Sequence, residues 1–233
     1  MMNPVPWLQM TNMISYQGLV RTFLRHTLTP IVNFNSGDVF SFEIKQRILK
    51  NNGSVLNNHS DERMSFIRQL EFFQKLNRQD ALSYRGLFID AAASLLDTRS
   101  AWKDFIPFVF QFRVNVGVKM QTIMNESSDI ALDNIIKLKS LGVRFWMIAD
   151  DEWPSLQMSK SFHPYIDGVK IDSNFFEAAF SRGDATELRR ILNAWGGEQT
   201  IVHGLEHKEH FAFAVSNGFM LGQGTYCCAH PCH

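Results

Sequence analysis

The stretch Ser41-Phe42-Glu43-Ile44-Lys45-Gln46-Arg47 is the segment around which the rest of the chain is organised. It follows the apolar segment 28–32 and a turn centred on Gly37. This arrangement predicts a β-hairpin whose strands lie at residues 30–34 and 39–48 and meet at Gly37. Its second strand then carries the carboxylate of Glu43, early in a chain of 233 residues.

Downstream of this hairpin, strand and helix patterns alternate. Six further strands are predicted at residues 87–90, 107–116, 143–149, 168–172, 200–203 and 219–223. Helices are predicted at 91–105, 128–141, 206–217 and between 173 and 195. Such alternation implies a mainly parallel sheet, and eight strands imply a (β/α)8 TIM-like barrel of the α/β class with an antiparallel first strand.

Two further helices are predicted on either side of the hairpin. Residues 12–26 have an apolar pattern compatible with a helix, so residues 1–27 are expected to form a helical lead-in. Asp61 is placed to cap a second helix, with apolar residues at helical spacing from Met64 to Leu76. No linker, repeat or low-complexity segment interrupts the chain, so residues 1–233 are expected to form one domain.

The composition excludes several classes of partner. Apolar residues make up 45% of the chain and charged residues 20%, and 23 Lys and Arg balance 23 Asp and Glu. This balance provides no long-range field toward nucleic acid or an anionic membrane. No apolar run reaches the ~20 residues of a membrane span, and no secretory signal is recognised. We therefore expect a cytoplasmic protein without direct nucleic-acid or membrane binding.

The end of the chain, residues 226–233, is rich in Cys and His. It contains Cys227, Cys228, Cys232, His230 and His233. Such residues can chelate zinc, but their spacing matches no closed zinc module, and the odd number of cysteines argues against a disulfide framework. An ordinary tail is the preferred interpretation, and the role of these residues stays open.

Short motifs follow one another in a defined order along nearly the whole chain. They are Thr29-Pro30-Ile31-Val32, Glu43-Ile44-Lys45 followed by Arg47, Leu141-Gly142-Val143-Arg144, Lys170-Ile171-Asp172 followed by Phe175-Phe176, His203-Gly204-Leu205-Glu206, and Gln223-Gly224. In this order and spacing they resemble the EAL family, bacterial phosphodiesterases that open cyclic di-GMP with two divalent metals.

The resemblance implies a metal centre built from carboxylates and an amide at several strand ends, because hard cations prefer oxygen ligands. Glu43 is retained, and Asp90 matches the family's third-strand Asn. Arg113 matches the fourth-strand Glu, and its guanidinium repels a cation while offering no lone pair. His203 stands where the seventh-strand motif of the family begins with Glu.

The Asp-Asp pair of the family has more than one placement. Asp150 and Asp151 match it by residue type. Counting forward from Gly142 puts the pair at residues 148–149, whereas counting back from Lys170 puts it at 149–150. In each case Glu152-Trp153-Pro154 replaces the glycine-rich loop of active members, and at most one of the two aspartates is counted as a retained position.

These residues also have interpretations without chemistry. Arg113 or Lys170 can pair with Glu43 or Asp90, so that an ion pair replaces the metal charge. A histidine such as His203 is more often hydrogen-bonded than metal-bound, and a glutamine can satisfy backbone groups at a strand end. We expect a vestigial pocket with no metal, cofactor or catalytic residue, comprising Glu43, Asp90, Arg113, Asp150, Asp151, Lys170, His203 and Gln223.

Loss of metal ligands removes two-metal hydrolysis more completely than loss of one hydrogen-bond donor. We therefore expect a catalytically inactive protein that acts by protein–protein interaction. Its resemblance to degenerate EAL-like proteins of enteric bacteria implies binding to FlhD, a subunit of the flagellar master transcription activator, with repression of flagellar genes and motility. The helix at residues 207–217 is one candidate surface, although Phe211 and Phe213 suit a core equally well.

Two alternatives stay open. The first is a cyclic di-GMP receptor without hydrolysis, which would contact phosphate through Arg47, Arg113 and Arg144 because guanidinium pairs well with phosphate. The second is a weak cyclic di-GMP phosphodiesterase, which would use Glu43, Asp90, Asp150 or Asp151, Lys170 and His203. The preferred prediction does not include cyclic di-GMP as a partner.

Overall fold

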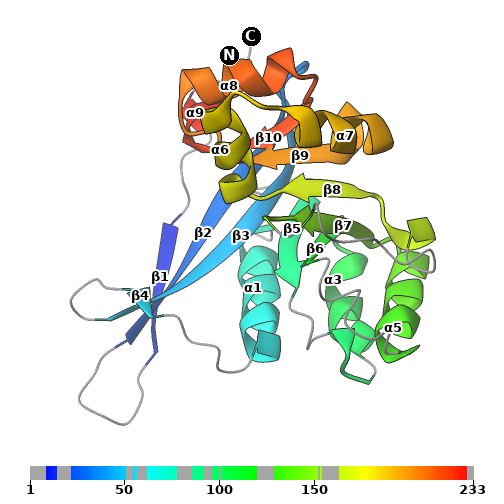
Figure 1. The fold of residues 1–233 in the computed structure, drawn as a ribbon. Helices are drawn as coiled ribbons and strands as arrows, with labels where there is room; N and C mark the ends of the chain where they lie inside the picture. The colour runs from blue at the N-terminus through cyan, green and yellow to red at the C-terminus, as the bar shows by residue number, and fades with distance from the viewer. Residues whose placement is uncertain are drawn as a thin grey trace.

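A computed structural model describes residues 9–14, 22–50, 55–56, 62–77, 86–91, 96–99, 101–119, 129–151, 153 and 163–229. Eight of its strands close into a barrel (Figure 1). Around the barrel they are β2 (Thr22–Asn33), β3 (Val39–Lys50), β5 (Gly86–Ala91), β6 (Val114–Lys119), β7 (Arg144–Ala149), β8 (Gly168–Ile171), β9 (Thr200–His203) and β10 (Leu221–Gln223).

Strand β2 is the antiparallel member of this barrel. It pairs antiparallel with β3 on one side and with β10 on the other, whereas the pairs from β3 to β10 are parallel. Between β2 and β3, the turn contains Gly37 with a φ of 71°, which glycine adopts without steric cost. The predicted (β/α)8 TIM-like barrel with an antiparallel first strand is thus confirmed.

The hairpin of β2 and β3 extends well beyond the barrel. Each strand has 12 residues, and their outer halves pair with two short strands, β1 (Gln9–Ile14) and β4 (Val55–Leu56). The predicted lead-in helix at 12–26 is therefore wrong for the described residues, which belong to β1 and β2. Its apolar spacing suits either structure, and the ladder from Thr22 to Val32 against β3 decides for a strand.

The helices lie outside the barrel (Figure 1). The predicted helices after residue 61, at 128–141, after 172 and at 206–217 are present with small shifts at their ends. The helical elements are α1 (Glu62–Asn77), η1 (Ala101–Phe105), α3 (Ile106–Val109), α5 (Asp129–Ser140), η3 (His163–Tyr165), α6 (Ser173–Arg182), α7 (Thr186–Trp195), η4 (Gly197–Gln199), α8 (Lys208–Ser216) and α9 (Thr225–Ala229). Among the helices of the described residues, none has the length and apolar character needed to cross a membrane.

The segment between β5 and β6 differs most from expectation. A helix was predicted at 91–105 and a strand at 107–116, but η1 and α3 occupy residues 101–109 and β6 begins only at Val114. Phe105, Phe108 and Phe112 are buried at helix-like spacing, whereas Phe110 is exposed, so the aromatic run follows a helical turn. Pro107 also suits the first turn of a helix, where its missing N–H costs no hydrogen bond.

The barrel interior contains a small cluster of apolar residues, one from each of five strands. It consists of Ile31, Phe88, Trp146, Ile201 and Leu221. Side chains alternate between the two faces of a strand, so residues two positions further along share the inner face. This places Asp90, His203 and Gln223 inside the barrel at the carboxyl ends of β5, β9 and β10. We refer to this end as the barrel mouth.

The Cys- and His-rich end is described only in part. Residues 225–229 form α9, and Cys227 is buried against the core rather than part of a free tail. His230, Cys232 and His233 lie outside the described residues, so the question of zinc binding there stays a prediction. The expectation of one domain over residues 1–233 also stays a prediction.

Candidate site at the barrel mouth

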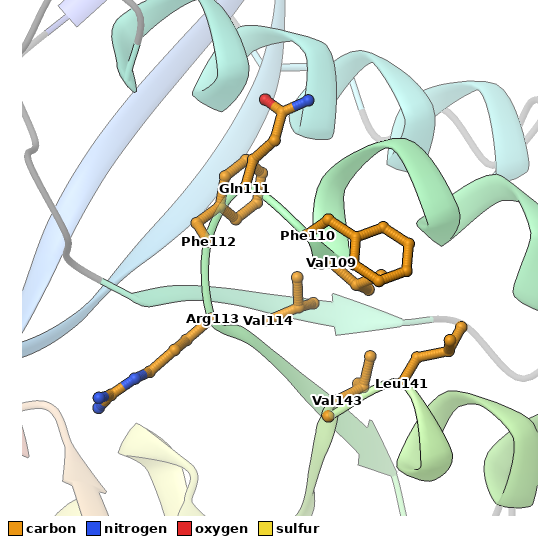
Figure 2. A pocket seen from close by; sticks show the side chains of 9 residues that line it. Val109, Phe110, Gln111, Phe112, Arg113, Val114, Leu141 and Val143 are labelled. Atoms are coloured by element: carbon orange, nitrogen blue, oxygen red, sulfur yellow. The ribbon is translucent and has the colours of Figure 1, made fainter.

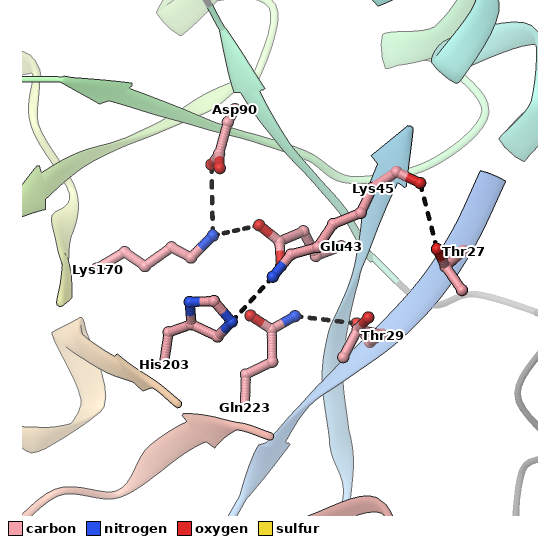
Figure 3. A network of polar contacts seen from close by, with 8 residues as sticks. All are labelled: Thr27, Thr29, Glu43, Lys45, Asp90, Lys170, His203 and Gln223. Atoms are coloured by element: carbon pink, nitrogen blue, oxygen red, sulfur yellow. Dashed lines mark hydrogen bonds and ion pairs between the residues drawn. The ribbon is translucent and has the colours of Figure 1, made fainter. Parts of the chain in front are cut away.

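The mouth brings together polar side chains from five different strands. Glu43 comes from β3, Asp90 from β5, Lys170 from β8, His203 from β9 and Gln223 from β10 (Figure 3). Because these strands end at one side of the barrel, residues separated by more than one hundred positions in sequence come into contact. Five of the eight residues predicted to line the pocket therefore share one site.

Lys170 joins the two carboxylates. Its Nζ donates a hydrogen bond to Oε1 of Glu43 and lies 3.4 Å from Oδ1 of Asp90. The side chains of Glu43 and Lys170 are only 1% and 4% exposed, whereas that of Asp90 is 50% exposed. Below them, the Phe88 ring lies 4.7 Å from the Lys170 ammonium and adds a cation–π contact. Of the two expected cations, Lys170 is the one that pairs with Glu43 and Asp90.

Lys45 is a second cation in the site, which sequence reasoning did not include. Its Nζ lies 3.4 Å from Oε2 of Glu43 and donates to Nε2 of His203 at 2.9 Å. Glu43 and Lys45 are two positions apart on β3, so both side chains point into the barrel. Strand alternation alone identifies Lys45, because Glu43 is predicted to line the pocket and Lys45 lies two positions further along the same strand.

The ionisation of Glu43 follows from these neighbours. Burial alone would raise the pKa of Glu43, but the positive charges of Lys170 and Lys45 outweigh it and lower the pKa to about 2. Burial likewise acts to lower the pKa of Lys170, while Asp90 and Glu43 raise it above its ordinary value. At neutral pH the buried carboxylate and the buried ammonium are therefore both charged.

His203 is neutral in this environment. Burial, Lys45 and Lys170 together lower the pKa of His203 to about 4, so the imidazole carries no charge at neutral pH. Its Nε2 accepts the hydrogen bond from Lys45, which leaves the ring proton on Nδ1. His203 thus serves as a hydrogen-bond acceptor for the lysine, in line with the interpretation of this residue as hydrogen-bonded.

Gln223 contacts the backbone. Its Nε2 donates to the carbonyl oxygen of Thr29 at 3.3 Å, and the side chain is fully buried. This bond ties β10 to β2 where the barrel closes. Gln223 therefore satisfies a backbone group at a strand end, the simpler of the interpretations considered for it.

The two aspartates after β7 differ in position. Asp150 is half-buried at the rim and lies 3.9 Å from the Lys119 ammonium of β6, whereas Asp151 is exposed in the following turn. The β7 residue that pairs with Lys170 across the ladder is Ile148, which has no ligand atom. Asp150 and Asp151 are not among the eight residues of the network drawn in Figure 3.

The assignment of Arg113 to the mouth is wrong. Arg113 precedes β6, so it lies at the amino end of that strand, on the far side of the barrel from Asp90. The β6 residue paired with Asp90 is Gly117, where an added Cβ would lie 2.5 Å from Oδ1 of Asp90. The error has the same origin as the misplaced strand at 107–116, which began seven residues too early.

The residues of the mouth do not fit a pair of divalent metals. Oε1 of Glu43 accepts from Lys170, and Oε2 lies 3.4 Å from the Lys45 ammonium without a hydrogen-bond partner among the described residues, while Gly117 and Ile148 have no side-chain ligand. Within the described residues, no group of three or more His, Cys, Asp and Glu side chains is placed to hold a metal. Lys45 and Lys170 balance the charges of Glu43 and Asp90, so no excess negative charge remains to attract a cation.

Comparison with solved structures identifies the architecture. The PaMucR phosphodiesterase in complex with c-di-GMP superimposes with a TM-score of 0.68 at 16% identity, over 89% of this chain and 91% of that one. The EAL domain of Mycobacterium smegmatis DcpA gives 0.67 at 17% identity, over 88% and 91%. The chain has the EAL-domain fold. The EAL enzyme Bd1971 has a TM-score of 0.65 at 16% identity over 89% of this chain, which spans 62% of that enzyme's length.

Sequence comparisons are more restricted than the structural ones. No family model matches the chain. Protein YghO of Escherichia coli K12 is 70% identical over 37 residues, which are 16% of this chain and only 10% of YghO. Because the sequence identities are below one fifth, the EAL structures establish only the fold of this chain. Its activity depends on the side chains at the barrel mouth.

Replacing Glu43 tests the ion-pair network. Glu43→Gln should lower the free energy of unfolding by about 3–5 kcal/mol, because it leaves two ammonium groups without their shared anion. Adding Lys170→Met to this variant should recover part of the loss. Urea denaturation measures both effects. Lys137→Met, which breaks an exposed helical pair with Asp133, is the control and should cost less than about 0.5 kcal/mol.

The low pKa of His203 predicts a pH dependence of stability. Its folded pKa of about 4 lies below the ordinary histidine pKa of 6.5, so the unfolded chain binds more protons between these values. The His203 contribution should therefore fall by up to about 3 kcal/mol as the pH drops from 6.5 to 4. Urea denaturation of wild type and His203→Gln across this range isolates the effect. Parallel stability curves for the two proteins would contradict it.

Proposed function

We propose that this EAL-like barrel does not hydrolyse cyclic di-GMP and acts by binding a protein partner. The observation that carries the proposal is the pairing of Glu43 with both Lys45 and Lys170. Glu43 and Asp90 together balance the two ammonium groups, and Oε1 of Glu43 accepts a hydrogen bond from Lys170, so the buried charge is compensated by fixed groups rather than by an exchangeable ion.

The chemistry of phosphodiester cleavage supports the same conclusion. Two-metal enzymes stabilise both the attacking and the leaving oxygen with cations held by several carboxylates. Here Gly117 and Ile148 supply no oxygen, and Asp150 pairs with Lys119 at the rim. His203 is neutral and its Nε2 accepts a hydrogen bond from Lys45, so this nitrogen is not free to activate a water molecule.

The partner we propose is FlhD, the subunit expected from the resemblance to degenerate EAL-like proteins of enteric bacteria. Binding would hinder promoter engagement by the flagellar activator and so reduce flagellar gene expression and motility. The Phe residues of α8 are not the proposed surface. Phe211 packs edge-on against Phe34, and Phe213 packs against Phe176 and Phe180.

The main alternative is a receptor that binds cyclic di-GMP without cleaving it, since the similar PaMucR structure is a complex with c-di-GMP. The three arginines proposed for phosphate do not support this alternative. Arg113 and Arg144 lie at the amino ends of β6 and β7, away from the mouth. The side chain of Arg47 lies outside the described residues. A weak phosphodiesterase activity is the remaining alternative.

A titration with nucleotide and metal separates these functions. Calorimetry of the chain with cyclic di-GMP, with and without magnesium or manganese, should show no binding heat, and chromatography should detect no linear dinucleotide. These results are expected because no described carboxylate cluster is free to hold the metals. Metal-independent heat would favour the receptor. A linear product that disappears in Glu43→Ala would instead establish a phosphodiesterase and contradict the proposal.

Binding to purified FlhD tests the proposed partner. Size-exclusion chromatography of the mixture should show a complex, and expression of the chain should reduce swimming in soft agar. Lys45→Leu removes the second cation of the mouth but leaves Glu43 paired with Lys170, so this variant should retain both effects. If the two proteins elute separately and swimming is unchanged, FlhD is not the partner.

A further inference from the structure

A hollow of about 370 Å³ lies at the end of the barrel opposite the mouth (Figure 2). It is formed where the segment after α3 enters β6 and where α5 turns into β7. Its apolar lining is supplied mainly by Val109, Phe110, Val114, Leu141 and Val143. None of these side chains takes part in the network around Glu43, so the hollow is separate from the candidate site.

Phe110 is the most unusual residue of this hollow. It is 76% exposed, whereas Phe108 and Phe112 on either side of it are 6% and 8% exposed. The helical turn that buries these two neighbours directs Phe110 outward. A single exposed aromatic residue is unremarkable in itself, but one that borders a hollow with both apolar and polar side chains is typical of an interaction site.

The rim next to Phe110 is held in place before any ligand binds. The backbone N–H groups of Gln111 and Phe112 both donate to the carbonyl of Phe108, at 2.9 and 3.2 Å. The Gln111 side chain donates to the carbonyl of Pro107 at 2.7 Å and accepts from Gln74 of α1 at 3.0 Å. These bonds reduce the conformational entropy that docking would otherwise cost.

The charge at this end of the barrel is unbalanced. Arg113 lines the hollow and is exposed, and Arg144 is exposed at the start of the neighbouring strand. Neither guanidinium forms an ion pair with an acidic side chain of the described residues. Asp167, which directly precedes β8, is already paired with Lys139 at both of its oxygens. Figure 2 shows the Arg113 guanidinium extending away from Phe110, so the apolar and basic features are adjacent but distinct.

We infer that this hollow docks a segment of a partner protein in which an acidic residue lies a few positions from a bulky apolar residue. The apolar side chain packs against Phe110 and Leu141, and the carboxylate pairs with Arg113. The inference rests on the proposed function of binding a protein and assigns a surface to it. Nucleic acid fits less well, because the net charge of the chain is zero and provides no long-range attraction to phosphate.

A phage-displayed library of short random peptides, selected on the full chain, tests the docking site without assuming the partner. Enriched peptides should combine Asp or Glu with a nearby Leu, Phe or Trp. A synthetic peptide of this type should bind Phe110→Ser and Arg113→Glu at least about tenfold more weakly than wild type. Replacing its acidic residue by Lys should restore binding to Arg113→Glu, which a merely structural effect would not do.

Val215→Ser is the matched control, because Val215 is an exposed apolar residue (45%) on α8 and should leave the affinity unchanged. Phe110 and Arg113 are both exposed, so the Phe110→Ser and Arg113→Glu variants should unfold at nearly the same temperature as wild type. The inference would be overturned if no peptides were enriched, or if the enriched peptides lacked an acidic residue. Peptide binding that survives Phe110→Ser, or self-association of the chain through Phe110, would also overturn it. FlhD binding that persists in Phe110→Ser would overturn the docking site while leaving the proposed function standing.

Discussion

The buried carboxylate of Glu43 is the constraint on which the mouth of the barrel depends. A charged group that is 1% exposed loses nearly all of its hydration, and such a loss is tolerated only where opposite charges and hydrogen bonds replace the water. Lys170 supplies one contact from β8 and Lys45 another from β3 itself. Through Lys45 the network continues to His203 on β9, so one carboxylate links three strands across the barrel.

This arrangement differs chemically from a metal centre in the same place. A divalent ion exchanges, brings bound water and accepts electron pairs, whereas an ammonium group is covalently tethered and only donates hydrogen bonds. Lys45 and Lys170 therefore reproduce the charge neutralisation that a cation would give Glu43, but none of its reactivity. In this arrangement the electrostatic requirement of the buried carboxylate is met by side chains of the barrel itself.

The fold was largely predictable because the alternation of strands and helices repeats through most of the chain and each unit is short. The failures occurred where one pattern suited two structures. The segment 12–26 and the aromatic run from Phe105 to Phe112 both lack decisive local signals, and tertiary pairing or burial decided them. The second failure displaced Arg113 from the amino end of β6 to the mouth.

Glu43, Asp90, Lys170, His203 and Gln223 were assigned to one site by their motifs, and the structure places them together. Their roles depended on neighbours that motif matching does not show. Lys45 was not predicted as a site residue because it stands where the Glu-Ala-Leu motif has an apolar residue, two positions after Glu43. The face that a residue occupies on its strand was the more reliable guide, since it follows from backbone geometry alone.

The two ends of the barrel contrast in charge and exposure. At the mouth, positive and negative groups contact one another and the aromatic residue beneath them is buried. At the opposite end, an exposed Phe110 and Arg113 border a hollow, Arg144 is exposed at the start of β7, and neither arginine has an acidic partner among the described residues. Exposed apolar side chains and charged groups without an ion-pair partner can contribute free energy on binding, whereas groups already paired within a protein gain little from a second partner. Binding is therefore expected at the end of the barrel that has no part in phosphodiester chemistry.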